Sequence, residues 1–282
     1  MPVGITVAAV LTAALLLAAW IGTQRQHRAA AAAEEQLTRA QSPNAGRARL
    51  DRNWDHLPAP VARYLRLAIV SSTEVEHVRI VQTGRLRTDA MSDRWMPFDA
   101  THLVVPRAAG FFWNARVQVA PLLHVRVHDA LIDGKGSGAV SLMSAVPVSA
   151  SADSLGMNSG SLHRFLAEAV WYPSALRPSD ILRWTDIDAT KSLATLTSHG
   201  ITVSLEFWFG GSGEVVGIYT PARWGTFAGG YQQLPWEGHF SDYRERDGFM
   251  VPARGDVGWY IDGQWRAVWE GTVRTYHARA GQ

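Results

Sequence analysis

Two ionisable side chains on a helical stretch, and an arginine beside a tryptophan, are the residues of this sequence most suited to chemistry. His163 and Glu168 lie five residues apart, and Arg223 directly precedes Trp224. A guanidinium next to an indole can bind a carboxylate or phosphate while the ring covers an apolar tail. A carboxylate and an imidazole bordering a pocket could instead serve acid–base catalysis. The sequence thus predicts a ligand-binding site with these residues and leaves any catalytic residue unknown.

Trp171 is the fifth candidate, because of its place on the stretch HRFLAEAVWYPSAL. Apolar residues repeat there at helical spacing and form one wide stripe: Leu162, Phe165, Leu166, Ala169 and Val170. At 100° per residue, Trp171 lies near the opposite side, and Glu168 lies at the edge of the stripe. A helix inside a half-barrel is contacted on two sides, so Trp171 would pack against a second layer or a ligand.

Each candidate also has an ordinary structural interpretation. Arg164 and Glu168 could form a surface ion pair worth about 0.3–0.5 kcal/mol, with Trp171 capping the core. His163 beside the apolar stripe is typical of a histidine at a core edge. Arg223 could close the Gly-rich connection TPARWGTFAGG that the sequence predicts around it.

No metal or cofactor is expected. His124 and His128 share one face of a predicted strand, but residues four apart on a strand are separated by about 13 Å. One ion cannot bridge them, because its ligand bonds are near 2 Å. The sequence contains neither a Gly-x-Ser-x-Gly elbow nor a His-Glu-x-x-His pair, and it has no cysteine for thiolate chemistry or cysteine-based metal sites.

Composition indicates a folded chain and argues against a nucleic-acid surface, although folding could still gather basic residues into a patch. Apolar residues make up 47% and charged residues 18% of the 282 residues, which is typical of globular proteins. The formal net charge is only +2, and no dense Lys/Arg run follows position 28. Twelve tryptophans is a high number, and such large amphipathic rings suit a β-rich core or an apolar site.

The N-terminus carries a predicted membrane anchor. Val3–Gly22 has no charge, and twenty helical residues span a hydrocarbon core of about 30 Å. The alternative is a signal peptide cleaved near the Ala-rich stretch 29–33, although no basic segment precedes the run. Arg25 and Arg28 favour a cytoplasmic location of the main domain by the positive-inside rule. Export of the domain is the alternative, so the sequence leaves the side of the membrane undecided.

Beyond the anchor, assigned to residues 1–24, we expect a helical stem and linker over 25–56 and a single antiparallel β-rich domain over 57–282. A helix is predicted within 57–70, and period-two strands follow with tight turns at Asp133-Gly134, Asp247-Gly248 and Asp262-Gly263. Residues 144–160 are Ser-, Gly- and Pro-rich and predict a long mobile loop or lid. The expected fold is a mainly β (α+β) protein, with a large curved antiparallel sheet or incomplete barrel and a few inserted helices.

Several segments resemble an uncharacterised bacterial family, a group of domains of unknown function. They are LPAPVARYL at 57–65, LHRFLAEAVWYPSAL at 162–176 and HFSDYRERDGFMVPARGDVGW at 239–259. Within the third segment, Tyr243-Arg244, a turn at Asp247-Gly248 and then Met250-Val251-Pro252 are also distantly similar to the closing hairpin of the bacterial lipoprotein-carrier (LolA/LolB-like) group. That second resemblance implies an incomplete barrel around helices that holds acyl chains.

Three functions remain in view. The favoured one is a non-enzymatic, membrane-anchored module that binds a lipid or another hydrophobic molecule in a half-barrel cavity. The alternatives are a membrane-associated enzyme of unknown reaction that uses Glu168, His163 and Arg223, and a scaffold whose exposed aromatic side chains bind a partner protein.

Overall fold

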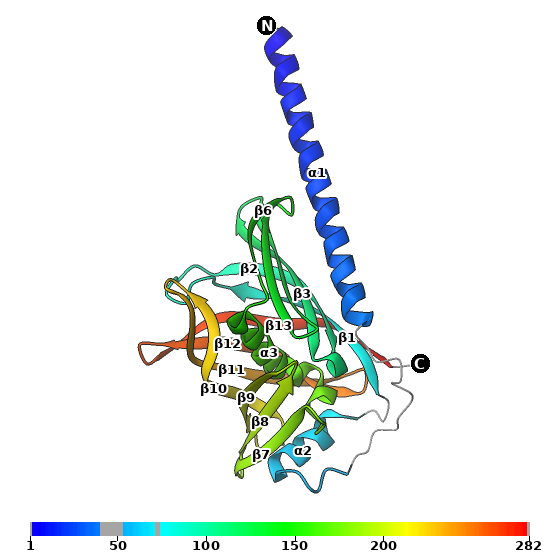
Figure 1. Ribbon diagram of the computed structural model, residues 1–282, viewed down its shortest axis with the longest axis vertical. Coiled ribbons are helices and arrows are strands. Elements are labelled where there is room, and N and C mark those ends of the chain that lie inside the picture. The colour runs from blue at the N-terminus through cyan, green and yellow to red at the C-terminus, as the bar shows by residue number, and fades with distance from the viewer. Residues whose placement is uncertain (1, 40–52, 71–73, 281–282) are drawn as a thin grey trace.

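The protein is built around one curved antiparallel sheet, seen in a computed structural model that describes residues 2–39, 53–70 and 74–280 (Figure 1). Of the side chains within residues 2–16, only that of Ala13 is described.

In the described ranges the helices are α1 (Pro2–Arg39), α2 (Ala59–Ala68) and α3 (Leu155–Glu168), with short 3-10 turns at Pro106–Ala108, Ala169–Trp171 and Pro173–Leu176. The first strands are β1 (Val75–Leu86), β2 (Met96–Val105), β3 (Gly110–Ala120), β4 (Leu123–Ile132), β5 (Lys135–Leu142) and β6 (Val146–Ala152). The later strands are β7 (Leu182–Asp188), β8 (Lys191–Ser198), β9 (Ile201–Phe209), β10 (Val215–Phe227), β11 (Gly230–Arg246), β12 (Phe249–Ile261) and β13 (Gln264–Ala280).

The described strands form a single 13-stranded sheet in the order β6-β5-β4-β3-β2-β1-β13-β12-β11-β10-β9-β8-β7. Each half is a simple meander, and the pairing of β1 with β13 joins the first half to the last. The predicted Asp-Gly turns are confirmed, because Asp133-Gly134, Asp247-Gly248 and Asp262-Gly263 all have positive φ at both residues. Such pairs suit the twist of a hairpin. The predicted fold class, a mainly β chain with a curved antiparallel sheet and few helices, is confirmed.

Helix α3 lies within the concave side of the sheet and contacts both of its halves, β4 and β5 on one side and β9 and β10 on the other (Figure 1). Two glycines allow this close approach. A Cβ on Gly136 of β5 would lie 2.7 Å from the carbonyl oxygen of Met157, and a Cβ on Gly160 of α3 would lie 2.8 Å from that of Trp224. Ser154 caps the helix by accepting a hydrogen bond from the backbone N–H of Met157.

The two faces of the sheet carry separate cores because side chains alternate along each strand. On β3, Phe111 and Trp113 join the large core on the concave side, whereas Phe112 joins a small cluster on the convex side. Leu37 of α1 is fully buried in that small cluster, so the end of α1 docks on the outside of the sheet.

Helix α1 is continuous from Pro2 to Arg39. Within the described part of the chain, no helix combines the length and the apolar character needed to cross a membrane. Most side chains of the predicted span Val3–Gly22 lie outside the described residues, so the anchor stays a prediction. Residues 25–39 of the predicted stem continue α1, and the linker at 40–52 lies outside the described ranges.

Two expectations about loops were wrong. Residues 144–160 contain edge strand β6 and the first turns of α3, because β6 pairs with β5 and Ser154 supplies a helix cap. The stretch TPARWGTFAGG is mostly strand rather than a Gly-rich connection, since β10 runs on to Phe227. Pro221 is accommodated at a register shift between Thr220 and Arg223, where the strand does not need its N–H.

The crossing of α3 and β10 can be tested with Gly160→Ala. In an ordinary helix this change stabilises by about 1 kcal/mol. Here we expect a loss of about 1–3 kcal/mol in the free energy of unfolding, because the new methyl group would meet the backbone of Trp224. Urea unfolding measures the effect. Gly211→Ala is the control, since nothing lies within 4 Å of its added Cβ. A stabilised Gly160→Ala protein would contradict this packing.

Candidate functional site

Arg164 of α3 is the centre of a polar network on the concave side. Its Nε donates to Glu168 Oε1 at 2.8 Å, and a terminal nitrogen donates to Asp129 Oδ2 on β4 at 2.9 Å. The guanidinium also lies 5.0 Å from the ring centroids of Phe111 and Trp113. The side chains of Arg164 and Glu168 are only 18% and 16% exposed. Their pair therefore lies in a partly dry interior and not on the surface. In such an interior an ion pair needs good geometry to offset desolvation.

The second oxygen of Glu168 faces His102 of β2. Glu168 Oε2 lies 3.5 Å from His102 Nε2, and within the described residues neither that oxygen nor either ring nitrogen has a hydrogen-bond partner. Burial lowers the pKa of His102 well below its ordinary value, so its ring is neutral at neutral pH. Burial also raises the pKa of Glu168, an effect that Arg164 opposes. The contact therefore joins a neutral imidazole to a desolvated carboxyl group.

His102 and Asp129 were missed by the sequence analysis. The only local signal for His102 is a polar residue within the run ATHLVV, on the same face as the apolar Ala100 and Val104. Asp129 shares its strand face with Leu131, and its partner Arg164 is 35 residues away in the chain. Neither signal distinguishes a site residue from an ordinary strand residue.

Arg223 carries the second guanidinium of the network, which is partly buried. One terminal nitrogen donates to the carbonyl oxygen of Gly160 at 3.1 Å, and the guanidinium lies 4.5 Å from the ring centroid of Trp236 and 5.1 Å from that of Trp259. Burial, reinforced by the charge of Arg164, lowers the pKa of Arg223 to about 10, so the group remains charged at neutral pH. Among the described residues, Arg223 has no carboxylate partner and its Nε has no hydrogen-bond partner.

The other predicted site residues occupy different surroundings. Trp171 is 2% exposed, donates its indole N–H to Pro252 O at 3.0 Å and contacts the rings of Phe240 and Trp269. Trp171 lies in the 3-10 turn Ala169–Trp171 that follows α3, and the second layer that it contacts is the sheet itself. Trp224 is half-buried and covers Gly156 at the start of α3. His163 is buried, with Nδ1 3.2 Å from the carbonyl oxygen of Ser159. The structure therefore brings Glu168, His163 and Arg223 into electrostatic contact, with Arg223 acting on both of the others.

An apolar surface adjoins this network at one end of the concave face. Its side chains pack against the main core yet stay partly exposed, and antiparallel register places many of them next to one another, as in Leu86 opposite both Met96 and Trp269. We call this set the apolar mouth: Leu86, Met96, Val125, Val127, Phe227, Leu234, Val257, Ile261 and Trp269.

Aromatic rings form the floor of the apolar mouth. Trp269 stacks on Phe98 with ring centroids 5.7 Å apart, and Phe98 meets Trp113 edge-on. On the opposite side, Phe227 packs edge-on against Trp259 at 5.1 Å. Trp113 and Trp259 are also the rings that contact Arg164 and Arg223, so the apolar and charged parts of the site share the same aromatic side chains.

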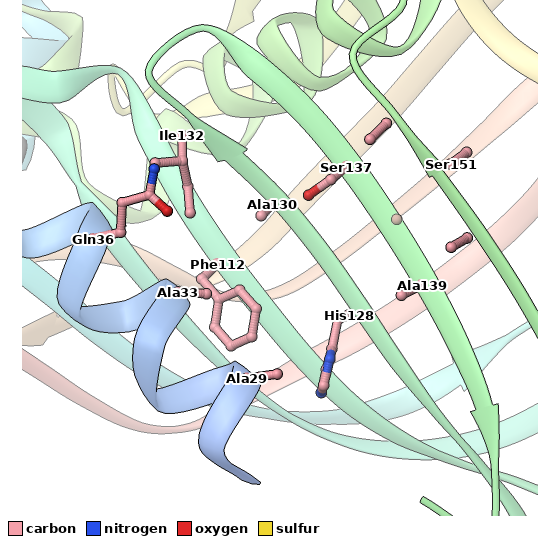
Figure 2. A pocket seen from close by; sticks show the side chains of 13 residues that line it. Ala29, Ala33, Gln36, Phe112, His128, Ala130, Ile132, Ser137, Ala139 and Ser151 are labelled. Carbon is pink, nitrogen blue, oxygen red and sulfur yellow. The ribbon is translucent and has the colours of Figure 1, made fainter. Parts of the chain in front are cut away.

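A second hollow lies on the convex side, between the end of α1 and strands β3 to β6 (Figure 2). This cavity has a volume of about 500 Å³. Ala29, Ala33 and Gln36 line it from α1, and Phe112 and His128 line it from the sheet. Its walls are mostly small or apolar side chains, and His128 contacts the ring of Phe112. Within the described residues, no group of three His, Asp or Glu side chains is placed to hold a metal ion.

The burial of His163 predicts a pH dependence of stability. Desolvation, together with the charge of Arg223, lowers its pKa from 6.5 to about 4. Below pH 6.5 the unfolded chain binds a proton that the folded chain rejects, so stability falls as pH drops toward 4. The contribution between pH 7 and 5 is about 2 kcal/mol. Urea unfolding at pH 7 and pH 5 measures the effect. Between these pH values the free energy of unfolding of His163→Gln should fall by about 2 kcal/mol less than that of the unchanged protein. The exposed His56→Gln should lose as much stability as the unchanged protein. Equal slopes in all three proteins would contradict the burial.

Comparison with known proteins gives a family and several distant structural likenesses. A domain described as an outer membrane lipoprotein-sorting protein, from Vibrio parahaemolyticus, is 11% identical, with 73% of this chain and 86% of that chain covered and a TM-score of 0.41. A LolA superfamily protein from Nitrosomonas europaea is also 11% identical, with 79% and 94% covered and a TM-score of 0.40. Such distant likeness carries no information on function. No curated protein matches. The model of the family of unknown function DUF6544 matches residues 49–271, which is most of the chain, and the protein therefore belongs to that family.

Proposed function

We propose that this domain is a binding module for a hydrophobic ligand, which lies in the apolar mouth on the concave face of the sheet. The observation that carries the proposal is the partial exposure of apolar side chains from β1, β2, β4 and β10–β13 at one end of that face. Apolar surface gathered in this way commonly marks a binding site. Each methylene group of a ligand buried there would contribute about 0.8 kcal/mol.

The aromatic floor supports the same proposal through its rigidity. Phe98, Trp113 and Trp259 are almost fully buried and are held by neighbouring rings, and Trp113 also donates to Gln82 Oε1 at 3.1 Å. A ligand that lies on a surface already fixed in place orders few side chains when it binds. The concave face near α3 is filled by the chain's own residues, such as Phe165 and Tyr172, so the proposed position is confined to the other end.

A second candidate position is the convex cavity below α1. Its volume of about 500 Å³ is in the range of small-molecule sites, and its walls are largely apolar. The two positions lie on opposite faces of the same strands, because Val127 of the mouth pairs with Val140 while His128 of the cavity pairs with Ala139. Substitutions at neighbouring residues of β4 and β5 can therefore affect one of the two positions without affecting the other.

Single charges placed on either face distinguish the two positions. Val127→Asp puts a carboxylate in the apolar mouth, and we expect it to weaken binding of a fluorescent apolar probe by at least about tenfold, because desolvating the charge is costly. Ala139→Asp puts the same charge in the convex cavity, and Val216→Asp puts it on an exposed part of β10. Both should bind as the unchanged protein does. Loss of binding in Ala139→Asp alone would move the ligand to the convex cavity. Circular dichroism verifies folding of each variant.

The proposal includes a membrane tether through Val3–Gly22. Twenty residues without a charge are long enough to span the hydrocarbon core, and Trp20 stands near one end, where interfacial aromatics are favoured. A tether would keep the binding domain close to a source of hydrophobic ligands.

Membrane fractionation tests the tether. The full chain should sediment with membranes and resist extraction with alkaline carbonate, because twenty uncharged and mostly apolar residues would have to leave hydrocarbon. A chain that lacks residues 1–24 should appear in the soluble fraction. Release of the full chain by carbonate, or retention of the shortened chain, would refute the anchor.

A further inference from the structure

We propose that the ligand has an anionic end, a carboxylate or a phosphate monoester, which binds to Arg223 while its apolar part lies in the apolar mouth. This inference rests on the proposed function and names the chemical class of the ligand. The two arginines of the network differ in their hydrogen-bond partners. Arg164 is bound to the carboxylates of both Glu168 and Asp129. Arg223, within the described residues, is bound to a backbone carbonyl group and to no carboxylate.

The donors of Arg223 are only partly used. A guanidinium has five N–H groups in a fixed plane, which match the geometry of a carboxylate or phosphate. One terminal nitrogen of Arg223 donates to Gly160 O, and the Nε–H has no partner among the described residues. A buried donor left in this way destabilises the folded protein. The Nε–H itself is enclosed, whereas Arg223 as a whole keeps partial exposure, so an anionic ligand would accept from the terminal nitrogens of the same guanidinium.

The surroundings of Arg223 hold its plane in place and exclude water. Trp236 and Trp259 are 3% and 7% exposed and lie against the guanidinium, whereas Arg223 itself keeps partial exposure. Contact with the two indole rings restricts the orientation of the guanidinium. In such a partly dry setting a charge-assisted hydrogen bond is stronger than in water.

Arg223 also borders the apolar mouth directly. It lies opposite Leu234 in the pairing of β10 with β11, and its neighbour Trp259 packs against Phe227. Leu234 and Phe227 both belong to the apolar mouth. An anion bound to Arg223 would therefore have an apolar surface immediately next to it. This combination fits an amphiphile with a single anionic head, such as a fatty acid or a lipid phosphate.

The experiment compares charged and neutral probes on the full chain in nanodiscs of zwitterionic phospholipid, with Trp20→Phe in every variant so that the predicted anchor contributes no tryptophan fluorescence. The probes are 9,10-dibromostearate and its methyl ester, whose bromine atoms quench tryptophan fluorescence at short range. We expect the carboxylate to bind at least about tenfold more tightly than the ester, about 1.4 kcal/mol. Arg223→Gln should reduce carboxylate binding to the level of the ester and leave ester binding unchanged. Arg223→Lys should keep part of the preference, because it keeps the charge.

The control is Arg254→Gln, which removes an exposed arginine from β12 and should retain the full preference. Equal binding of the two probes to the unchanged protein would overturn the anionic end but leave the hydrophobic site standing. Quenching by neither probe would instead refute the proposed function. Loss of both probes in Arg223→Gln, with no recovery in Arg223→Lys, would make Arg223 a structural residue and overturn the inference. Displacement of dibromostearate by hexadecyl phosphate or by hexadecanoate, whichever is effective at lower concentration, identifies the head as phosphate or carboxylate.

Discussion

The insertion of α3 between the two halves of the sheet is the contact on which the rest of the structure depends. Close approach requires glycine at the crossing points, Gly136 on β5 and Gly160 on α3, because a Cβ at either position would meet backbone atoms. Asn158 strengthens the first crossing by accepting from the N–H of Gly136 at 2.7 Å. These contacts bring strands from opposite ends of a 13-stranded sheet against a single helix.

The same insertion explains why only part of the concave face is open to a ligand. Side chains of α3 and the following 3-10 turns fill one end of the hollow, where Phe165, Tyr172 and Phe207 are fully buried. At the other end of the concave face the side chains of the apolar mouth stay partly exposed. The concave face thus presents an apolar surface beside a packed core.

Burying two arginines in this hollow has unequal consequences. Arg164 gains two carboxylates and two aromatic rings, which together offset its desolvation. Arg223 gains two indole rings and one carbonyl oxygen, and its lowered pKa reflects the incomplete compensation. A charge kept partly unsatisfied at the border of an apolar surface costs folding stability, and such a cost is often retained where it serves recognition.

Local pattern in the sequence determined most of the strands, the Asp-Gly turns, the apolar stripe that begins in α3 and the mainly β fold class, because alternation and turn chemistry depend on near neighbours. Only the tertiary structure decided that the Arg164–Glu168 pair is buried, that His102 faces Glu168 from 66 residues away, and that Arg223 lies on a strand beside Trp236 and Trp259. Edge strand β6 was missed because its small residues carry little strand signal until they pair with β5. The site escaped prediction because it is made by contacts between distant segments, and burial, which sets its pKa values and charges, exists only after the sheet has curved around the helix.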